Sequence, residues 1–188
     1  MRAARSRWRK AQPQWDSARL VFIDETGLNT KMARLYGRAL RSQRCVAAVP
    51  QGHWKTSTFI AALRCDGLAA PFLIEGAVNA EVFTAYLREV LCPELKKGDI
   101  VILDNLSTHK IPSVAELITA QGATVRYLPA YSPDLNPIEM AFAKLKAHLR
   151  QTAARTLGEL QSAVVGSLTT FTPAHCQAFF RHAQYASI

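Results

Sequence analysis

The chain has 188 residues, 49% hydrophobic and 20% charged, and its 23 Lys and Arg outweigh 14 Asp and Glu to give a net charge of +9. These values fit one globular domain and exclude a disordered, collagen-like or coiled-coil chain. The longest stretch without a charged side chain, residues 160–180, contains Gln, Ser, Thr, Pro and His, so no membrane segment is expected. The four cysteines form no C-x-x-C pair and no zinc-type cluster, which favours free thiols in a reducing cytosol.

The positive charge is concentrated toward the N-terminus. Residues 1–19 have a net charge of +5, residues 20–60 have +4, and residues 61–188 are neutral overall. Such an excess suits a polyanionic partner, and nucleic acid is the expected one. Composition leaves three interpretations of the first segment open: a DNA-contacting arm, a solvated tail and an Arg-rich transit peptide. Its candidate DNA-binding residues are Arg5, Arg7, Arg9 and Lys10.

Apolar runs in the first half of the chain predict strands. Residues 19–24 and 99–104 are rich in β-forming side chains and each run ends in Asp, which predicts two strands covered on both faces. Residues 56–64 and 68–74 are separated by Cys-Asp-Gly, and the Asp-Gly pair predicts a hairpin.

Helical spacing of apolar residues follows. Asn79 is expected to cap the first helix, which Pro93 ends. The predicted helices cover residues 79–92, 112–121, 157–168 and 173–185, and a further strand covers residues 124–128. Because the first strands form a hairpin and later strands alternate with helices, the sequence predicts an α/β domain with a mixed sheet.

A Pro-rich loop, residues 128–139, reads LPAYSPDLNPIE. Proline fixes φ and lacks an N–H, so the three prolines predict a rigid loop. Asn136 is expected at the N-cap of a helix, with Pro137 and Glu139 as its first and third residues. Apolar residues then recur at helical spacing, which predicts an amphipathic helix.

Three carboxylates occupy positions typical of an active site. Asp24 and Asp104 end two predicted strands, and Glu139 lies in the first turn after the Pro-rich loop. If the two strands are neighbours, the aspartates lie side by side and the loop brings Glu139 opposite them. Like charges about 4 Å apart repel by roughly 4 kcal/mol at an intermediate dielectric, so the cluster requires a cation. Oxygen ligands favour Mg²⁺ or Mn²⁺.

Two such ions can activate an attacking oxygen and stabilise the leaving oxygen of a phosphodiester. Together with the basic charge, this predicts cleavage or transfer of nucleic-acid strands. Each acid also has a simpler interpretation. Glu139 can complete a capping box with Asn136, and a lone Asp often ends a strand or enters a turn.

Neighbouring polar residues extend this candidate site. The residues expected to support the three acids are Glu25, Asn105, His109 and Asn136. His109 would orient Asp104 or a phosphate, and the alternative is a surface residue or a helix-start residue. Lys146 and Arg150 share the helix face of Glu139, where a phosphate chain could bind. Two roles are possible for the side chains of Trp8, Trp15 and Trp54: stacking on nucleic-acid bases and packing within the protein.

Three ordered motifs resemble those of a known family. They are FIDETG at 22–27, ILDN at 102–105 followed by HK at 109–110, and the Pro-rich loop, and thirty-four residues separate Asp104 from Glu139. The chain resembles, over roughly residues 16–187, the catalytic domain of IS630-type transposases in the Tc1/mariner group of DDE enzymes. The resemblance implies an RNase H-like fold, a mixed five-stranded sheet flanked by helices. It also implies that the catalytic residues and ligands of two Mg²⁺ or Mn²⁺ ions are Asp24, Asp104 and Glu139.

The same resemblance implies DNA cleavage and strand transfer at insertion-sequence ends, a homodimer in the active complex, and a bacterial cytoplasmic protein that is nucleoid-associated when bound to DNA. We expect a basic arm or linker at residues 1–17 and the catalytic domain at 18–188. Residues 1–17 are too short for the family's end-binding helix-turn-helix domain, so a truncated copy and a second reading frame with an upstream-frame partner both remain open. Phe142 stands where relatives often have Trp, and we expect it still to pack. The alternative functions are a catalytically silent DNA-binding fragment and a stand-alone RNase H-like nuclease.

Overall fold

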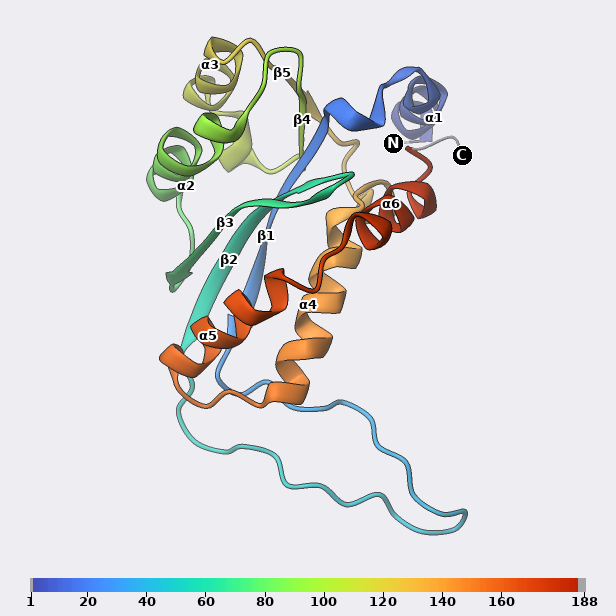
Figure 1. Ribbon diagram of the computed structural model, residues 1–188, viewed down its shortest axis with the longest axis vertical. Helices are drawn as coiled ribbons and strands as arrows, with labels where there is room; N and C mark the ends of the chain where they lie inside the picture. Colours follow the sequence, from blue (N-terminus) through green and yellow to red (C-terminus); the bar gives the residue numbers. More distant parts are fainter. Residues whose placement is uncertain (1, 186–188) are drawn as a thin grey trace.

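The structure is a computed structural model that describes residues 2–185 (Figure 1). A five-stranded sheet has the order β3-β2-β1-β4-β5. The strands are β1 Leu20–Asn29, β2 Thr56–Arg64, β3 Gly67–Glu75, β4 Ile100–Leu103 and β5 Thr124–Tyr127. Strand β2 pairs antiparallel with both β1 and β3, whereas β4 pairs parallel with both β1 and β5. The predicted mixed five-stranded sheet is therefore confirmed. Met1 is the first residue of the expected arm at 1–17, and residues 186–188 are the last of the expected domain at 18–188. Both lie outside the described residues.

Helices cover both faces of the sheet (Figure 1). They are α1 Arg2–Ala11, α2 Ala80–Tyr86, α3 Pro112–Ala120, α4 Ile138–Thr152, α5 Leu157–Leu168 and α6 Pro173–His182. Helices α2 and α3 pack on one face of the sheet, and α4, α5 and α6 pack on the other. No helix within residues 2–185 is both long enough and apolar enough to cross a membrane.

Alternation along β1 produces the two cores. Leu20 and Phe22 belong to the core under α4, α5 and α6, whereas Val21 and Ile23 belong to the core under α2 and α3. Successive side chains of a strand point to opposite faces, so one short apolar run supplies both cores. Burial of each large apolar side chain stabilises the fold by about 2 kcal/mol relative to an exposed one.

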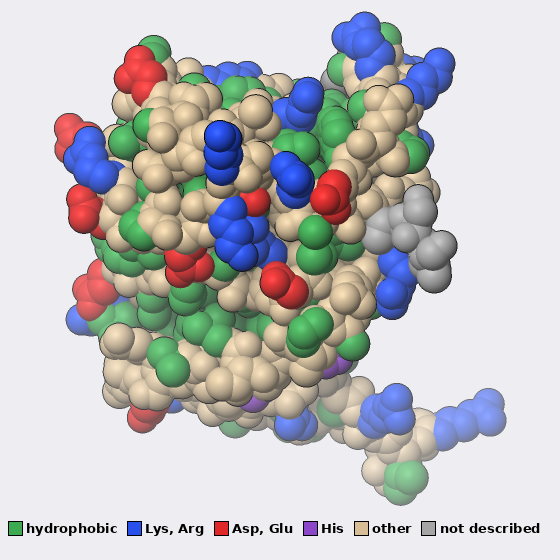
Figure 2. All heavy atoms as spheres, turned by 45° about the horizontal axis from the view of Figure 1, so that its top comes forward, with side chains coloured by type: hydrophobic (Ala, Val, Ile, Leu, Met, Phe, Trp, Pro, Cys, Tyr) green, Lys and Arg blue, Asp and Glu red, His purple; other side chains and the backbone are tan. Residues whose placement is uncertain are grey.

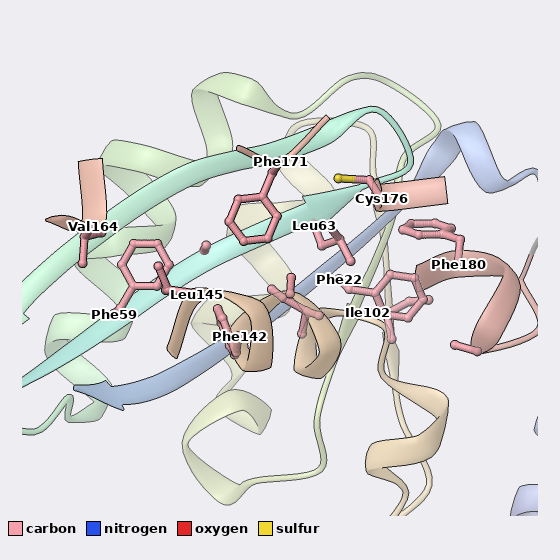
Figure 3. Close-up of a cluster of buried hydrophobic side chains, with 14 of the residues drawn as sticks. Phe22, Phe59, Leu63, Ile102, Phe142, Leu145, Val164, Phe171, Cys176 and Phe180 are labelled. Atoms are coloured by element: carbon pink, nitrogen blue, oxygen red, sulfur yellow. The ribbon is translucent and has the colours of Figure 1, made fainter. Parts of the chain in front are cut away.

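Aromatic side chains fasten α4 and α6 to the sheet (Figure 3). The ring centroids of Phe59 and Phe142 lie 6.1 Å apart, and those of Phe22 and Phe180 lie 5.4 Å apart, both in edge-to-face geometry. Phe142 is 2% exposed, so it packs as expected at the position where relatives often have Trp. This packing fixes the helix that begins at the Pro-rich loop.

Several element boundaries differ from the predictions. Strand β1 continues past Asp24 to Asn29, because β2 pairs with it along this whole stretch. The predicted hairpin is present, but its two turn residues are Cys65 and Asp66, since Gly67 already pairs with the opposite strand. The α-helix that Asn79 caps ends at Tyr86, and the chain continues through wider and tighter helical turns to Glu94.

The N-terminal basic segment forms helix α1. Trp8 and Trp15 pack against the core beside α6, with ring centroids 4.9 Å apart, and Trp15 stacks on Tyr185 at 6.3 Å. Packing is therefore the observed role of these two tryptophans. Trp54 is 54% exposed, and the Nζ atom of Lys31 lies 4.4 Å from the centre of its ring.

Residues 30–55 form a long loop between β1 and β2 that projects from the body (Figure 1). The loop carries six Lys and Arg residues and no Asp or Glu. Figure 2 shows Lys and Arg side chains on this projection, whereas acidic and basic side chains are mixed over the visible face of the body. Much of the N-terminal positive charge is thus held away from the sheet.

Candidate active site

Asp24 and Asp104 lie on neighbouring parallel strands. In the register of β1 and β4, Phe22 is opposite Ile102, and Asp104 directly follows the last residue of β4. Phe22 and Ile102 both face the core under α4. Side chains two residues further along emerge on the same face, so the two aspartates stand on the α4 side of the sheet. The condition under which the sequence places the two aspartates side by side, that their strands are neighbours, is therefore met.

Glu139 comes to the same place from the first turn of α4. One pocket is lined by all three acids, with Asn105 and Leu106 after β4 and the Pro-rich loop opposite. The loop supplies Tyr131 and Asn136 to the lining. The sheet, the end of β4 and the start of α4 thus bring together three carboxylates that are far apart in the sequence.

Asp24 is the most buried of the three acids, with 9% of its surface exposed. Its Oδ1 accepts a hydrogen bond from the N–H of Glu25, and its Oδ2 accepts one from Nδ2 of Asn136, both at 2.8 Å. Burial raises the pKa of Asp24 to about 7, and the nearby negative charges, that of Glu139 foremost, add to the rise. The metal-free site therefore resists full ionisation at neutral pH.

Asn136 is committed to Asp24 and does not cap α4. The cap position is taken by Pro137, and no side chain bonds to the helix start. The expected N-cap at Asn136 and the capping-box interpretation of Glu139 are therefore wrong. The reason is a tertiary contact that outweighs local capping: Asn136 is 4% exposed, and its Nδ2 donates to Oδ2 of Asp24.

His109 links Asp104 to Glu25. Its Nδ1 lies 2.6 Å from Oδ1 of Asp104 and its Nε2 lies 2.9 Å from Oε1 of Glu25. Burial lowers the pKa of His109, but the hydrogen bonds to the two carboxylates outweigh it and raise the pKa to about 9. The ring is thus protonated at neutral pH and donates both bonds. It is 1% exposed and lies 4.4 Å from the ring of Phe83, so the alternative of a surface histidine is wrong.

The same bond affects the ionisation of Asp104. Burial opposes its charged form, but the His109 hydrogen bond and the N–H of Leu106, which donates to Oδ1 at 3.0 Å, lower the pKa below its ordinary value. Asp104 is therefore ionised at neutral pH, whereas Asp24 is close to its titration point. The two aspartates differ in charge because burial and neighbouring acids dominate at Asp24, whereas the bonds from His109 and Leu106 outweigh burial at Asp104.

Within residues 2–185, no three His, Cys, Asp or Glu side chains are arranged ready to hold a metal ion. The carboxylate of Asp24 is turned to Asn136, and Oδ1 of Asp104 is taken by His109. The donor set still fits a hard divalent cation, because all three acids supply oxygen to one pocket. A cation would also favour the charged form of Asp24. In addition, Oδ1 of Asn136 is buried without a hydrogen-bond partner, so this oxygen would be available to a cation in the pocket.

The candidate DNA-binding residues do not form one group. Arg5 and Arg9 lie against Asp134 of the Pro-rich loop, with N···O distances of 2.6 and 3.2 Å. The other four are partly or fully exposed: Arg7 and Lys10 on α1, and Lys146 and Arg150 on α4.

Sequence reasoning missed two apolar side chains at the pocket. Leu106 is 53% exposed and Tyr131 is 87% exposed, and both line the pocket that holds the three acids. Tyr131 has a left-handed backbone with φ of 54°, a conformation that a non-glycine residue adopts only where its surroundings impose it. The prolines on either side of Tyr131 were the available signal of such a constrained loop.

Comparisons with known proteins identify the family and the fold of the chain. The DDE superfamily endonuclease family matches residues 19–161. The fold is similar to that of a Mos1 transposase paired-end complex with the left transposon end, with a TM-score of 0.77, 16% identity, and coverage of 97% of this chain and 57% of that chain. A Mos1 mariner paired-end complex with Mn gives a TM-score of 0.70, 20% identity, and coverage of 95% and 55%.

The catalytic domain of Mos1 mariner transposase gives a TM-score of 0.68, 14% identity, and coverage of 97% of this chain and 85% of that domain. No curated protein sequence matches the chain significantly. At these identities the Mos1 structures establish the fold, which is RNase H-like as expected. The family match covers most of the chain, and the chain belongs to the DDE superfamily endonucleases.

Proposed function

We propose that the chain is the catalytic domain of an IS630-type transposase that cleaves and joins DNA strands at the ends of an insertion sequence. The observation that carries the proposal is the meeting of Asp24, Asp104 and Glu139 at one pocket, from β1, the end of β4 and the first turn of α4. The motif spacing and membership of an endonuclease family support it. The Mos1 complex with a transposon end supports DNA as the substrate.

Asp24, Asp104 and Glu139 are proposed to hold two Mg²⁺ or Mn²⁺ ions. Mos1 paired-end complexes have been solved with Mn and with Mg. When bound, two such ions would activate the attacking oxygen and stabilise the leaving oxygen of the phosphodiester. The attacking group would be water in cleavage and a DNA 3′-hydroxyl in strand transfer.

The residues around the acids control their position and charge. Asn136 holds the carboxylate of Asp24 through the bond to Oδ2. His109 orients Asp104 and favours its ionised form, and Glu25 holds His109 from the other side. Asn105 is exposed and adds a polar group at the edge of the pocket. These residues would keep the ligands in place while DNA binds and leaves.

Basic residues outside the pocket would bind the DNA backbone. Lys146 and Arg150 follow Glu139 along one face of α4, so a strand with its phosphate at the acids would pass over them. The six candidates, including those in contact with Asp134, are Arg5, Arg7, Arg9, Lys10, Lys146 and Arg150. The basic 30–55 loop adds further positive charge for a long duplex.

The chain spans about 57% of the Mos1 transposase chain in the paired-end complex. Its action at DNA ends is therefore proposed to need a helix-turn-helix end-binding domain, joined to this chain or supplied from an upstream reading frame. A homodimer would hold the two ends together for transfer. The proposed setting is the bacterial cytoplasm, at the nucleoid.

Nicking of supercoiled plasmid in Mn²⁺ tests the proposal, because it needs no recognition of element ends. We expect the wild-type chain to nick the plasmid in Mn²⁺ and not in EDTA, and Asp104→Asn to lose this activity. Cleavage of an RNA–DNA hybrid without cleavage of plasmid would instead indicate a stand-alone RNase H-like nuclease. DNA binding without any cleavage, alone and with an end-binding domain supplied, would indicate a silent fragment.

A further inference from the structure

Helix α1 is attached to the Pro-rich loop by a set of side-chain bonds. Arg5 donates to both carboxylate oxygens of Asp134, from Nη1 at 2.8 Å and from Nη2 at 2.6 Å. The same Nη1 donates to Oγ of Ser132 at 2.8 Å. Arg9 adds a longer bond to Asp134 at 3.2 Å. The Arg5 guanidinium therefore grips two residues of the loop at once, in the two-pronged geometry that gives Arg–carboxylate pairs their directionality.

A second path joins α1 to the next loop residue. Trp8 donates from Nε1 to the hydroxyl of Tyr185, and that hydroxyl donates to the carbonyl oxygen of Leu135, both at 2.7 Å. Tyr185 is 3% exposed, so this relay is shielded from water. The Nε2 of Gln12 also donates to the carbonyl oxygen of Ala183, which fixes the end of α1 to the same C-terminal segment.

The loop segment held in this way directly precedes two site residues. Asn136, which bonds to Asp24, and Glu139 follow Leu135 within four residues. The segment is stiff: three prolines restrict it, and backbone bonds link Leu135 to Ser132 and Glu139 to Asn136. A displacement at Ser132 or Asp134 would therefore be transmitted to Asn136 and Glu139 rather than absorbed.

We propose that Arg5 is a positioning residue of the active site: through Asp134 and Ser132 it holds the Pro-rich loop so that Asn136 and Glu139 meet Asp24 and Asp104. This inference rests on the proposed function, since it treats Glu139 as a metal ligand. It gives α1 a role beyond contact with DNA. Two of its basic groups act on the loop, and Arg7 and Lys10 remain exposed.

Stability alone gives a weak reason for these contacts. The side chains of Arg5 and Asp134 are 26% and 48% exposed, and ion pairs in contact with water add little to the free energy of unfolding. A positioning role predicts a different pattern. Loss of Arg5 should change the melting temperature of the metal-free protein only slightly but weaken metal binding clearly.

The test uses the whole chain as Arg5→Ala, with Arg2→Ala as matched control. Arg2 lies on the same helix, is exposed, and loses the same charge. In the metal-free protein, hydrogen exchange of peptides covering residues 129–137 should become faster in Arg5→Ala and stay unchanged in Arg2→Ala. Titration with Mn²⁺ should give a dissociation constant about 10-fold higher in Arg5→Ala, the low end of effects seen for residues that support metal ligands.

Asp134→Ala provides a second variant that leaves α1 intact. It should also weaken Mn²⁺ affinity, and the effects of the two changes should be less than additive in the double variant, because both break the Arg5–Asp134 contact. Equal exchange or equal Mn²⁺ affinity in Arg5→Ala and Arg2→Ala would overturn the positioning role. A lowered melting temperature with unchanged Mn²⁺ affinity would also overturn it.

Glu139→Gln separates this inference from the proposed function. If wild-type protein binds Mn²⁺ more tightly than Glu139→Gln but Arg5→Ala behaves as Arg2→Ala, the proposed function is supported and the role of Arg5 is rejected. If wild-type and Glu139→Gln bind Mn²⁺ alike, the proposed metal site is contradicted, and the positioning of Glu139 by Arg5 is rejected with it.

Discussion

Asn136 donates a hydrogen bond from Nδ2 to Oδ2 of Asp24 at 2.8 Å, joining the Pro-rich loop to β1 across 112 positions of sequence. The bond ties the loop to β1 three residues before Glu139, which lines the same pocket as the two aspartates. It also occupies Oδ2 of Asp24, the acid of the three whose charged form is least favoured in the metal-free protein.

Asp24 should make the metal-free protein sensitive to pH. Its pKa is raised from 3.8 to about 7 in the folded state, so folding is favoured while Asp24 is protonated, and stability falls as pH rises from about 4 to 7. In EDTA, the free energy of unfolding of Asp24→Asn relative to wild type should increase by about 2 kcal/mol between pH 5 and pH 8. Urea unfolding at both pH values measures this. The exposed Asp66, changed to Asn, is the control and should show no such increase.

Divalent metal should stabilise the fold through Asp104. At a metal concentration about 100 times the dissociation constant, binding adds about 2.7 kcal/mol to the free energy of unfolding. We expect Mn²⁺ to raise the melting temperature of wild-type protein and to raise that of Asp104→Ala much less. Asp104→Ala should also melt lower in EDTA, because buried His109 loses a carboxylate partner. The quantity to compare is therefore the change in melting temperature that Mn²⁺ causes in each protein. Identical changes in wild type and Asp104→Ala would contradict a metal site at Asp104.

DNA binding should depend steeply on salt. Each phosphate contact contributes about 0.9 to the slope of log affinity against log salt concentration. Four single substitutions to Ala, at Arg7, Lys10, Lys146 and Arg150, should each lower the magnitude of this slope by about 1. Deletion of residues 1–10 should lower it further, since five of those residues are Arg or Lys. An unchanged slope after the deletion would make the segment a solvated or purely structural element.

Cysteine reactivity should follow burial. Cys45 is exposed, whereas Cys176 is fully buried and burial raises its pKa to about 11. The thiolate is the form that reacts with a thiol reagent. At pH 8 such a reagent should therefore label exposed Cys45 quickly in the folded protein, and should label buried Cys176 only after unfolding. Mass spectrometry of the labelled peptides gives the order. Rapid labelling of Cys176 in the native protein would contradict the packing of α6 against the sheet.

Much of the sheet was predictable from the sequence because its strands are short apolar runs between turns. The hairpin of β2 and β3 follows from such a pattern, whereas the pairing of β1 with β4 was only a condition of the site hypothesis. The full length of β1 could not be predicted in this way, because residues 25–29 do not form an apolar run and are in the strand through their pairing with β2. Helix α1 was missed because half of its side chains are charged, and its contacts are with the distant Asp134 and Tyr185.

The acids of the site were predictable, but their partners were only partly so. Position at strand ends and helix starts indicates Asp24, Asp104 and Glu139. Local capping rules assign Asn136 to α4, and only the folded chain shows that its amide serves Asp24 instead. The bond from His109 to Glu25 likewise joins residues 84 positions apart, a distance over which sequence spacing gives no signal.

Glu139 is proposed to act as a metal ligand in strand cleavage. The most direct measurement compares wild type, Glu139→Gln and the control Glu116→Gln, an exposed change on α3, in Mg²⁺ with an end-binding domain supplied and a linear DNA carrying the element's ends. We expect Glu139→Gln to melt close to wild type in EDTA and to lose cleavage, while Glu116→Gln keeps both. Robust cleavage by Glu139→Gln would contradict the assignment of Glu139 to the metal site.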